Sequence, residues 1–211
     1  MAKKLESTLR NMILSLVLIS AVMSAALGYV YVLTKDPIAK SNEKAEQDAI
    51  KAVLSDFDNN PATDKKEIDG VTYYPATKGG NPSGCAVKTF TLKGFSGKFT
   101  VMVGFLPDGT INKIQVLEQN ETPGLGTKMK EPKFMNQFLG KNPANWKMLV
   151  KKDGGEVDAI SAATITSRAF CDALQRGFDG YMKNFMSKKE EIKVVADTAT
   201  INVSDTTKIG E

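Results

Sequence analysis

The chain opens on one long apolar segment, after which short apolar runs alternate with polar turns. Residues 12–33 carry no charged side chain, and as an α-helix they span roughly 33 Å at about 1.5 Å per residue. The hydrocarbon core of a bilayer is about 30 Å thick, so the segment is long enough to cross it. Lys3, Lys4 and Arg10 precede it, and by the positive-inside rule they place the N-terminus in the cytoplasm and the remaining chain outside.

Two interpretations of this segment remain open. A retained anchor is favoured, because the apolar core of a signal peptide is usually only about 7–15 residues long. The small residues Ser24, Ala25 and Ala26 offer a cleavage site, so a removed signal peptide is the alternative. Either way, we expect the main domain on the extracytoplasmic (periplasmic) side of a bacterial inner membrane.

The exported part predicts three helices around a set of strands. Pro37 is expected to end the anchor helix, and residues 38–57 predict a second helix with apolar side chains on one face. Further helices are expected over residues 131–139 and 167–184. Strands are expected at residues 68–74, 85–92, 99–106 and 111–117.

The arrangement of these elements predicts the fold class. The turn Pro107-Asp108-Gly109 joins the last two strands into a hairpin, and the final strand alternates so that one face is wet. Runs of strands bracketed by helices favour an α+β fold with a largely antiparallel sheet. The expected divisions are an N-terminal tail, an anchor, a linker helix region, a main domain and a polar tail, over residues 1–11, 12–34, 35–64, 65–187 and 188–211.

Composition excludes several kinds of chemistry. The 211 residues include no histidine, so the chain supports no Ser-His-Asp triad and no His-ligated metal of its own, and we expect no metal site. Half of the net charge of +4 lies in the first ten residues, and the other 201 residues carry only +2, so no nucleic-acid partner is expected. Cys85, Cys171 and Trp146 are interpreted as core side chains, and nothing in the sequence shows whether the two cysteines pair.

Two segments stand out as candidates for chemistry. Hydroxyl side chains gather where the last helix is expected to begin, at Ser161, Thr164, Thr166 and Ser167. Unpaired N–H groups at a helix N-terminus attract phosphate, although ordinary capping is the plainer interpretation of such residues. The second segment, residues 121–126, has a proline and two glycines that let the backbone approach a bulky group, or that simply form a surface turn.

Both segments resemble one known family. Residues 158–169 (DAISAATITSRA) resemble the flavinylation motif of the FMN-binding subunits of bacterial respiratory ion pumps. Residues 121–126 (ETPGLG) resemble a second shared segment, and Phe134 with residues 137–141 resembles the helix that follows it. The likeness covers roughly residues 71–184 plus the anchor. It is stronger toward the G subunit of the Rnf electron transport complex than toward the C subunit of the Na⁺-translocating NADH:quinone reductase.

The resemblance implies covalent FMN. In that family the FMN phosphate is esterified to the threonine that matches Thr164, by a separate flavin transferase for which Asp158 is part of the recognition signal. The remaining residues that the resemblance assigns to cofactor binding are Ser161, Ala163, Thr166, Ser167, Glu121, Thr122, Gly124, Leu125 and Gly126. Two positions depart from the family: Ala162 replaces the usual glycine, and Gln119 replaces a common histidine.

The function implied is that of a membrane-anchored flavoprotein. It would be a non-autonomous electron-transfer subunit of an ion-translocating ferredoxin:NAD⁺ oxidoreductase, whose partners are the other subunits, the flavin transferase and the lipid bilayer. One alternative is the equivalent C subunit of the quinone reductase. A second alternative, from a different class, is an anchored binding or assembly module without flavin, which the ordinary capping of residues 161–167 would allow.

Overall fold

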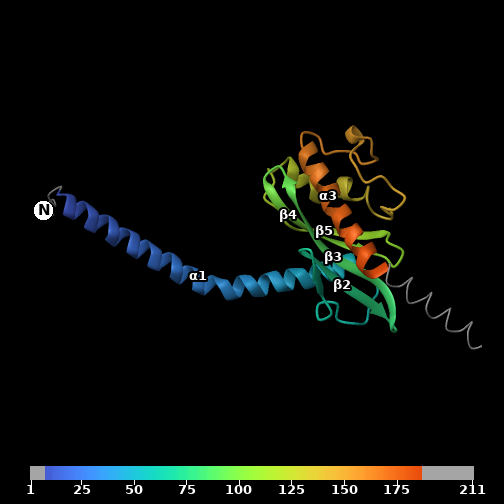
Figure 1. Cartoon of the computed structure of the whole chain (residues 1–211), viewed down its shortest axis with the longest axis horizontal. Helices are drawn as coiled ribbons and strands as arrows, with labels where there is room; N and C mark the ends of the chain where they lie inside the picture. Colours follow the sequence, from blue (N-terminus) through green and yellow to red (C-terminus); the bar gives the residue numbers. More distant parts are fainter. Residues whose placement is uncertain (1–7, 187–211) are drawn as a thin grey trace, which may run out of the picture. The chain divides into compact units, whose positions relative to one another are not determined.

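The computed structural model describes residues 8–186, and Figure 1 shows their elements in chain order. Those elements are α1 (Leu9–Val53), β1 (Lys66–Ile68), β2 (Val71–Lys78), β3 (Asn81–Gly94), β4 (Gly97–Phe105), β5 (Ile111–Glu118), α2 (Pro132–Met135) and α3 (Thr164–Tyr181). Backbone contacts divide the chain between Ala45 and Glu46 into two compact units.

The first unit consists of the N-terminal part of α1. The helix α1 is long and apolar enough to cross a membrane, and the large apolar side chains between Leu9 and Ile38 are exposed. The expected end of the helix at Pro37 is wrong, because α1 continues through that residue. The neighbours Ala39 and Lys40 are good helix formers, and together with the rest of the helix they outweigh the local cost of the proline.

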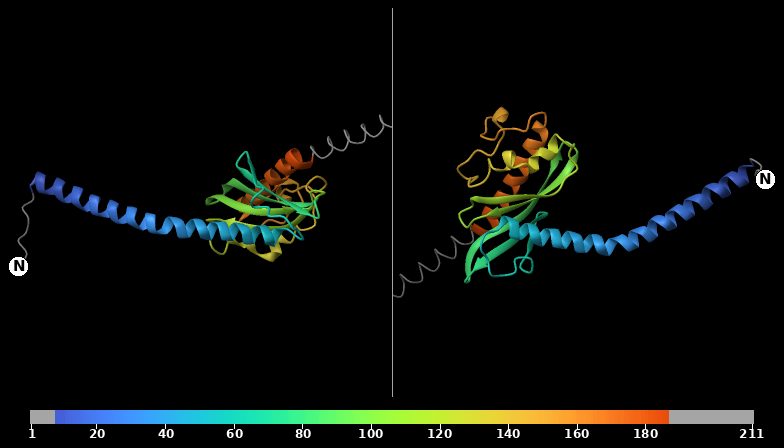
Figure 2. Two further views of the ribbon diagram at one scale, coloured as in Figure 1. Left: turned by 90° about the horizontal axis from the view of Figure 1, so that it is seen from below. Right: turned by 180° about the vertical axis from the view of Figure 1, so that it is seen from behind.

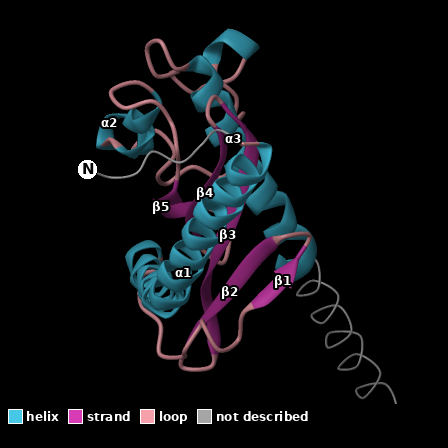
Figure 3. Ribbon diagram, turned by 90° about the vertical axis from the view of Figure 1, so that its left-hand side faces the viewer, coloured by secondary structure: helices cyan, strands magenta, loops and turns pink. Residues whose placement is uncertain are grey.

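The second unit is built on a five-stranded sheet in which every neighbouring pair is antiparallel. The strand order β1-β2-β3-β4-β5 follows the sequence, so the sheet is a simple meander, drawn in magenta in Figure 3. This arrangement confirms the α+β expectation. The strands expected at residues 85–92, 99–106 and 111–117 are present. The strand expected at 68–74 is divided by a turn at Asp69 and Gly70, both with positive φ, so that Ile68 ends the short edge strand β1 and β2 begins at Val71.

Both faces of the sheet are covered, each by its own core. Alternate side chains along a strand point to opposite faces, so one strand contributes to both cores. On one face, Tyr73, Val87 and Val103 belong to the larger core, which packs against α3. On the other face, the neighbouring residues Tyr74 and Met102 belong to a smaller core that contains the last turns of α1. Figure 2 shows α3 lying along the sheet from two further sides.

The end of α1 therefore belongs to the domain and does not act as a free linker. Ala49, Ile50 and Val53 are buried against the sheet. The Glu46 carboxylate also accepts a hydrogen bond from the Tyr74 hydroxyl at 2.5 Å and forms an ion pair with Lys88 at 2.5 Å. These contacts fix the last two turns of α1 on the sheet, within the segment 35–64 that the sequence pattern suggested as a linker.

The helical expectations in the second half of the chain need correction. The helix expected over residues 131–139 shortens to the single turn of α2, preceded by a 3₁₀ turn at Gly126–Lys130. The last helix begins at Thr164, three residues before its expected start, and continues as a π-turn at Met182–Met186. The polar tail expected over 188–211 lies outside the described residues.

The two cysteines are buried and free, as expected for core side chains, and Trp146 is buried against Phe138. Burial raises the pKa of both thiols, Cys85 and Cys171, to about 12. In the unfolded chain a thiol has a pKa of about 8.5. The stability that these neutral thiols contribute is therefore complete below about pH 8.5 and falls as the pH rises toward 12.

We predict that neither thiol reacts with N-ethylmaleimide at pH 8 in the folded full chain in detergent, because the reactive thiolate is absent and the sulfur is covered. Both should react after denaturation, at a rate at least about tenfold higher. Mass spectrometry after timed labelling measures both rates. Rapid labelling of either cysteine in the folded protein would contradict this description of the core.

Candidate functional site

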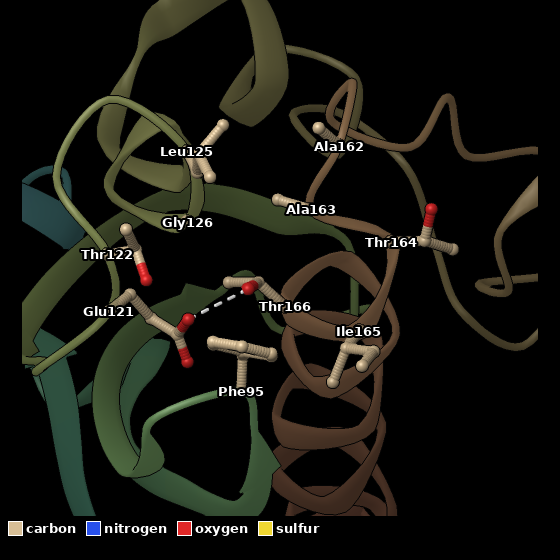
Figure 4. A pocket seen from close by; sticks show the side chains of 10 residues that line it. All are labelled: Phe95, Glu121, Thr122, Leu125, Gly126, Ala162, Ala163, Thr164, Ile165 and Thr166. Atoms are coloured by element: carbon tan, nitrogen blue, oxygen red, sulfur yellow. Dashed lines mark hydrogen bonds between the residues drawn. The ribbon is translucent and has the colours of Figure 1, made fainter.

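A cavity of about 320 Å³ lies where three segments of the domain meet. Figure 4 shows its lining: side chains from the β3–β4 turn, from the loop after β5, and from the start of α3. The two segments singled out by their sequence, residues 121–126 and 161–167, therefore lie side by side. The lining residues are Phe95, Glu121, Thr122, Leu125, Gly126, Ala162, Ala163, Thr164, Ile165 and Thr166.

The Glu121 carboxylate connects the three segments. The Thr166 hydroxyl, from the first turn of α3, donates a hydrogen bond to Glu121 Oε2 at 2.9 Å. The backbone N–H of Ser96, in the β3–β4 turn, donates to Glu121 Oε1 at 3.3 Å. Glu121 itself is only 5% exposed, and within residues 8–186 no lysine or arginine forms an ion pair with it. This buried carboxylate is thus held by neutral donors from two other segments.

Two glycines leave the space that this carboxylate occupies. A Cβ atom at Gly126 would lie 2.6 Å from Glu121 Oε2, and one at Gly94 would lie 2.6 Å from Glu121 Oε1. Real Cβ contacts are essentially never that short, so a larger residue at Gly126 would displace the carboxylate. One at Gly94 would also collide with the Gly97 carbonyl oxygen, at 2.3 Å. Gly126 is therefore required by the position of the Glu121 carboxylate, a reason that the sequence alone did not reveal.

The loop after β5 is closed by its own hydrogen bonds. The Thr122 carbonyl accepts from the backbone N–H of Leu125 at 3.1 Å, and the Gly124 N–H donates to the Thr127 hydroxyl at 2.9 Å. Gly124 adopts a left-handed φ of 76° and lies outside the cavity lining, so it shapes the turn. Leu125 and Thr122 are thereby presented to the cavity.

The start of α3 has an unusual backbone. Ala162 has a φ of 60°, which is the left-handed region that favours glycine. The next residue, Ala163, is the N-cap and makes no side-chain cap hydrogen bond. Ordinary side-chain capping therefore does not explain the hydroxyl residues here, and the first N–H groups of α3 remain open to an outside acceptor.

The hydroxyl residues of the motif have different surroundings. Thr164 is half-buried at the edge of the cavity, and its side chain points away from Glu121 and Thr166 (Figure 4). Ser161 is exposed and lines a separate cavity together with Asp158. Ser167 is fully buried, where its hydroxyl donates to the Ala163 carbonyl and accepts from the Ile160 N–H. Ser167 thus stabilises the turn before α3.

The side chain of Gln137 holds the backbone of Asp158. Gln137 lies in the segment 131–139, which the sequence predicted to be a helix. The amide of Gln137 accepts from the Asp158 N–H at 2.7 Å and donates to the Asp158 carbonyl at 3.2 Å. The Asp158 carboxylate remains exposed and pairs with Lys151 at 2.7 Å. At the other end of the motif, Arg168 forms a two-pronged contact with Asp153 and lowers the pKa of that carboxyl.

Two residues near the site were interpreted incompletely from the sequence. Gln119, where the family often has histidine, accepts a hydrogen bond from the Glu121 N–H at 2.7 Å and so helps to position the loop. Phe95 lines the cavity but was missed, because an aromatic residue in a glycine-flanked turn carries no motif of its own.

Comparison with known proteins gives four matches of interest. The family model for the FMN-binding domain matches residues 94–179. The G subunit of an ion-translocating oxidoreductase complex from Methanosarcina acetivorans is 35% identical over 178 residues, which cover 80% of this chain and 92% of the relative. The G subunit of the Na⁺-translocating ferredoxin:NAD⁺ oxidoreductase complex of Acetobacterium woodii is 32% identical over 185 residues, covering 80% and 89%. A solved structure, Shewanella oneidensis NqrC, matches with a TM-score of 0.43 and 24% identity over 61% of this chain and 67% of that one.

We predict that Ala162→Gly stabilises the domain by about 0.5–1 kcal/mol, because glycine removes the cost of a left-handed alanine, partly offset by its greater freedom in the unfolded chain. Denaturant unfolding of the full chain in detergent measures the change. Ala163→Gly is the matched control: its φ is −135°, so glycine gains nothing there and should destabilise. Destabilisation by Ala162→Gly would show that this backbone conformation is wrong.

Thr166→Val removes the hydroxyl donor to the buried Glu121 carboxylate and should cost about 1.5–3 kcal/mol, as expected for a hydrogen bond to a charged group. The control is Thr110→Val, which removes a hydrogen bond of similar length, 2.8 Å, to the exposed Asp108. There the lost partner is replaced by water, so the cost should stay below about 1 kcal/mol. Equal losses of unfolding free energy in the two variants would refute the special role of Glu121.

Proposed function

The chain belongs to the family of the G subunits of ion-translocating oxidoreductase complexes, and from this we propose that it relays electrons through FMN attached covalently to Thr164. Membership makes it an electron-transfer flavoprotein subunit of a multi-subunit oxidoreductase, with FMN as its cofactor. The observation that carries the finer proposal is the Glu121–Thr166 hydrogen bond, which brings together two sequence segments 45 residues apart around one cavity.

The chemistry of the cavity fits a flavin. The isoalloxazine ring is flat and largely apolar with polar edges, and the cavity has both kinds of surface. Phe95, Leu125 and Ile165 supply apolar side chains, while Glu121 and Thr122 supply polar atoms. Gly126 contributes its backbone to the same lining. When bound, FMN supplies the ability to accept and release one or two electrons.

Thr164 is suitably placed for a phosphate ester. It is the first residue of α3, where the positive end of the helix dipole and the open N–H groups favour a phosphate. Its side chain points away from the Glu121 carboxylate, which keeps the two negative charges apart (Figure 4). Ala163 and the backbone N–H groups of the first turn of α3 would contribute to the same phosphate pocket, whereas Ser161 lines the separate cavity with Asp158.

Attachment requires an outside enzyme. A threonine hydroxyl is a weak nucleophile, and the chain has no histidine to activate it. In the proposed step, Thr164 Oγ1 attacks the phosphorus on the FMN side of FAD, and AMP leaves as the pyrophosphate bond breaks. A base on the transferase accepts the hydroxyl proton. The exposed Asp158, held at its backbone by Gln137, is available as the recognition signal.

The N-terminal helix supports a position for the flavin at a membrane. The apolar helix anchors the chain in a membrane, and Lys3, Lys4 and Arg10 before it favour an extracytoplasmic position for the domain. The complex that we propose transfers electrons between ferredoxin and NAD⁺ and couples this to movement of Na⁺ or H⁺. The relatives from M. acetivorans and A. woodii are both G subunits, which favours this assignment over the C subunit of the quinone reductase.

Thr164→Val should abolish covalent flavin, because valine has the shape of threonine but no hydroxyl to esterify. The measurement is in-gel flavin fluorescence at the mass of this chain after expression of the full chain with a flavin transferase. Thr164→Ser retains the hydroxyl and should retain the fluorescent band. Thr122→Val, which removes another hydroxyl from the same cavity, should retain it too.

Two results would count against this proposal. A fluorescent band that persists in Thr164→Val would place the ester elsewhere. A wild-type protein that never acquires flavin beside an active transferase would instead favour an anchored binding module without FMN.

A further inference from the structure

Three large apolar side chains are exposed around the same cavity. Phe95 is 67% exposed, Ile165 is 49% exposed and Leu125 is 40% exposed, and each comes from a different segment. Figure 4 shows Phe95 and Ile165 on one side of the cavity and Leu125 across from them. Exposed apolar area of this kind is unfavourable in water, and a flat apolar group in the cavity would cover it.

The β3–β4 turn is fixed in place, although the side chain of Phe95 on it is exposed. The next residue, Ser96, donates its backbone N–H to Glu121 Oε1 at 3.3 Å. The preceding residue, Gly94, packs so closely on the same carboxylate that a Cβ atom there would lie 2.6 Å from it. The Glu121 carboxylate therefore positions Phe95 at the cavity together with the two motif segments.

We propose that Phe95 is a flavin-contacting residue, which packs its ring against the isoalloxazine and shields it from water. This inference rests on the proposed function. An aromatic side chain supplies a large apolar contact with little conformational freedom to lose, and offset or edge-to-face contacts between rings are favourable. The β3–β4 turn is thereby a third wall of the cofactor site, beside the loop after β5 and the start of α3.

The strand before the turn offers a matched control. Leu92 is also 67% exposed and lies on the same hairpin, but it does not line the cavity. Replacing it removes a similar amount of exposed apolar surface without touching the site. A general effect of the hairpin surface would therefore alter the flavin signal in both variants. Loss of a contact with flavin would alter it only when Phe95 is replaced.

The test is iodide quenching of flavin fluorescence in the full, flavinylated chain in detergent. Phe95→Ala should raise the quenching constant at least about twofold over wild type, because iodide then reaches the ring more easily. Phe95→Tyr should have the wild-type quenching constant, and Phe95→Leu should have a value between those of wild type and Phe95→Ala. The quenching constant of Leu92→Ala should equal that of wild type. The shape of the visible flavin absorption band, which responds to the polarity around the ring, should change in the same order.

The flavin content of each variant is measured beforehand by in-gel fluorescence, so that attachment and shielding are separated. Flavinylated Phe95→Ala with wild-type quenching and an unchanged absorption band would overturn this inference and leave the flavoprotein assignment intact. Equal increases in Phe95→Ala and Leu92→Ala would also overturn it, because they would show a general effect of the hairpin surface. Absence of flavin from the wild-type chain would refute the proposed function itself.

Discussion

One buried carboxylate, that of Glu121, determines the geometry of the candidate site. Burying a carboxylate is costly unless donors replace the water that it loses. Here the donors come from the start of α3 and from the β3–β4 turn, and Gly94 and Gly126 leave the space that the carboxylate occupies. Because this side chain, which belongs to the loop after β5, accepts hydrogen bonds from two other segments, its loss would release all three walls of the cavity together.

The rest of the fold supplies a rigid base for this arrangement. The sheet is covered on one face by α3 and on the other by the last turns of α1, so β2, β3 and β4 are buried between two cores. The aromatic side chains of Phe134 and Phe138 pack against Phe170 of α3 and fix the irregular segment after the loop. Loops on such a base can hold a cofactor while the chemistry comes from the cofactor.

The sequence predicted the strands, the anchor and the two motifs, because each is encoded locally by periodicity, length or turn chemistry. It did not reveal the Glu121–Thr166 contact, since partners 45 residues apart share no local signal. The glycine usual at position 162 in the family agrees with the positive φ of Ala162, a backbone conformation that glycine adopts without strain. The sequence overestimated the length of α2, because the helical spacing of Phe134 and Phe138 reflects packing between the two rings and not a continuous helix.

The central claim is that the cavity between residues 121–126 and the start of α3 holds a flavin esterified to Thr164. Its most direct test is mass spectrometry of the wild-type protein from its native membranes, with peptide mapping across Asp158–Arg168. The expected result is one added FMN on the peptide, less the water lost in forming the ester, with fragments that place it on Thr164. An unmodified peptide from cells that make an active flavin transferase, or FMN on another residue, would contradict the claim.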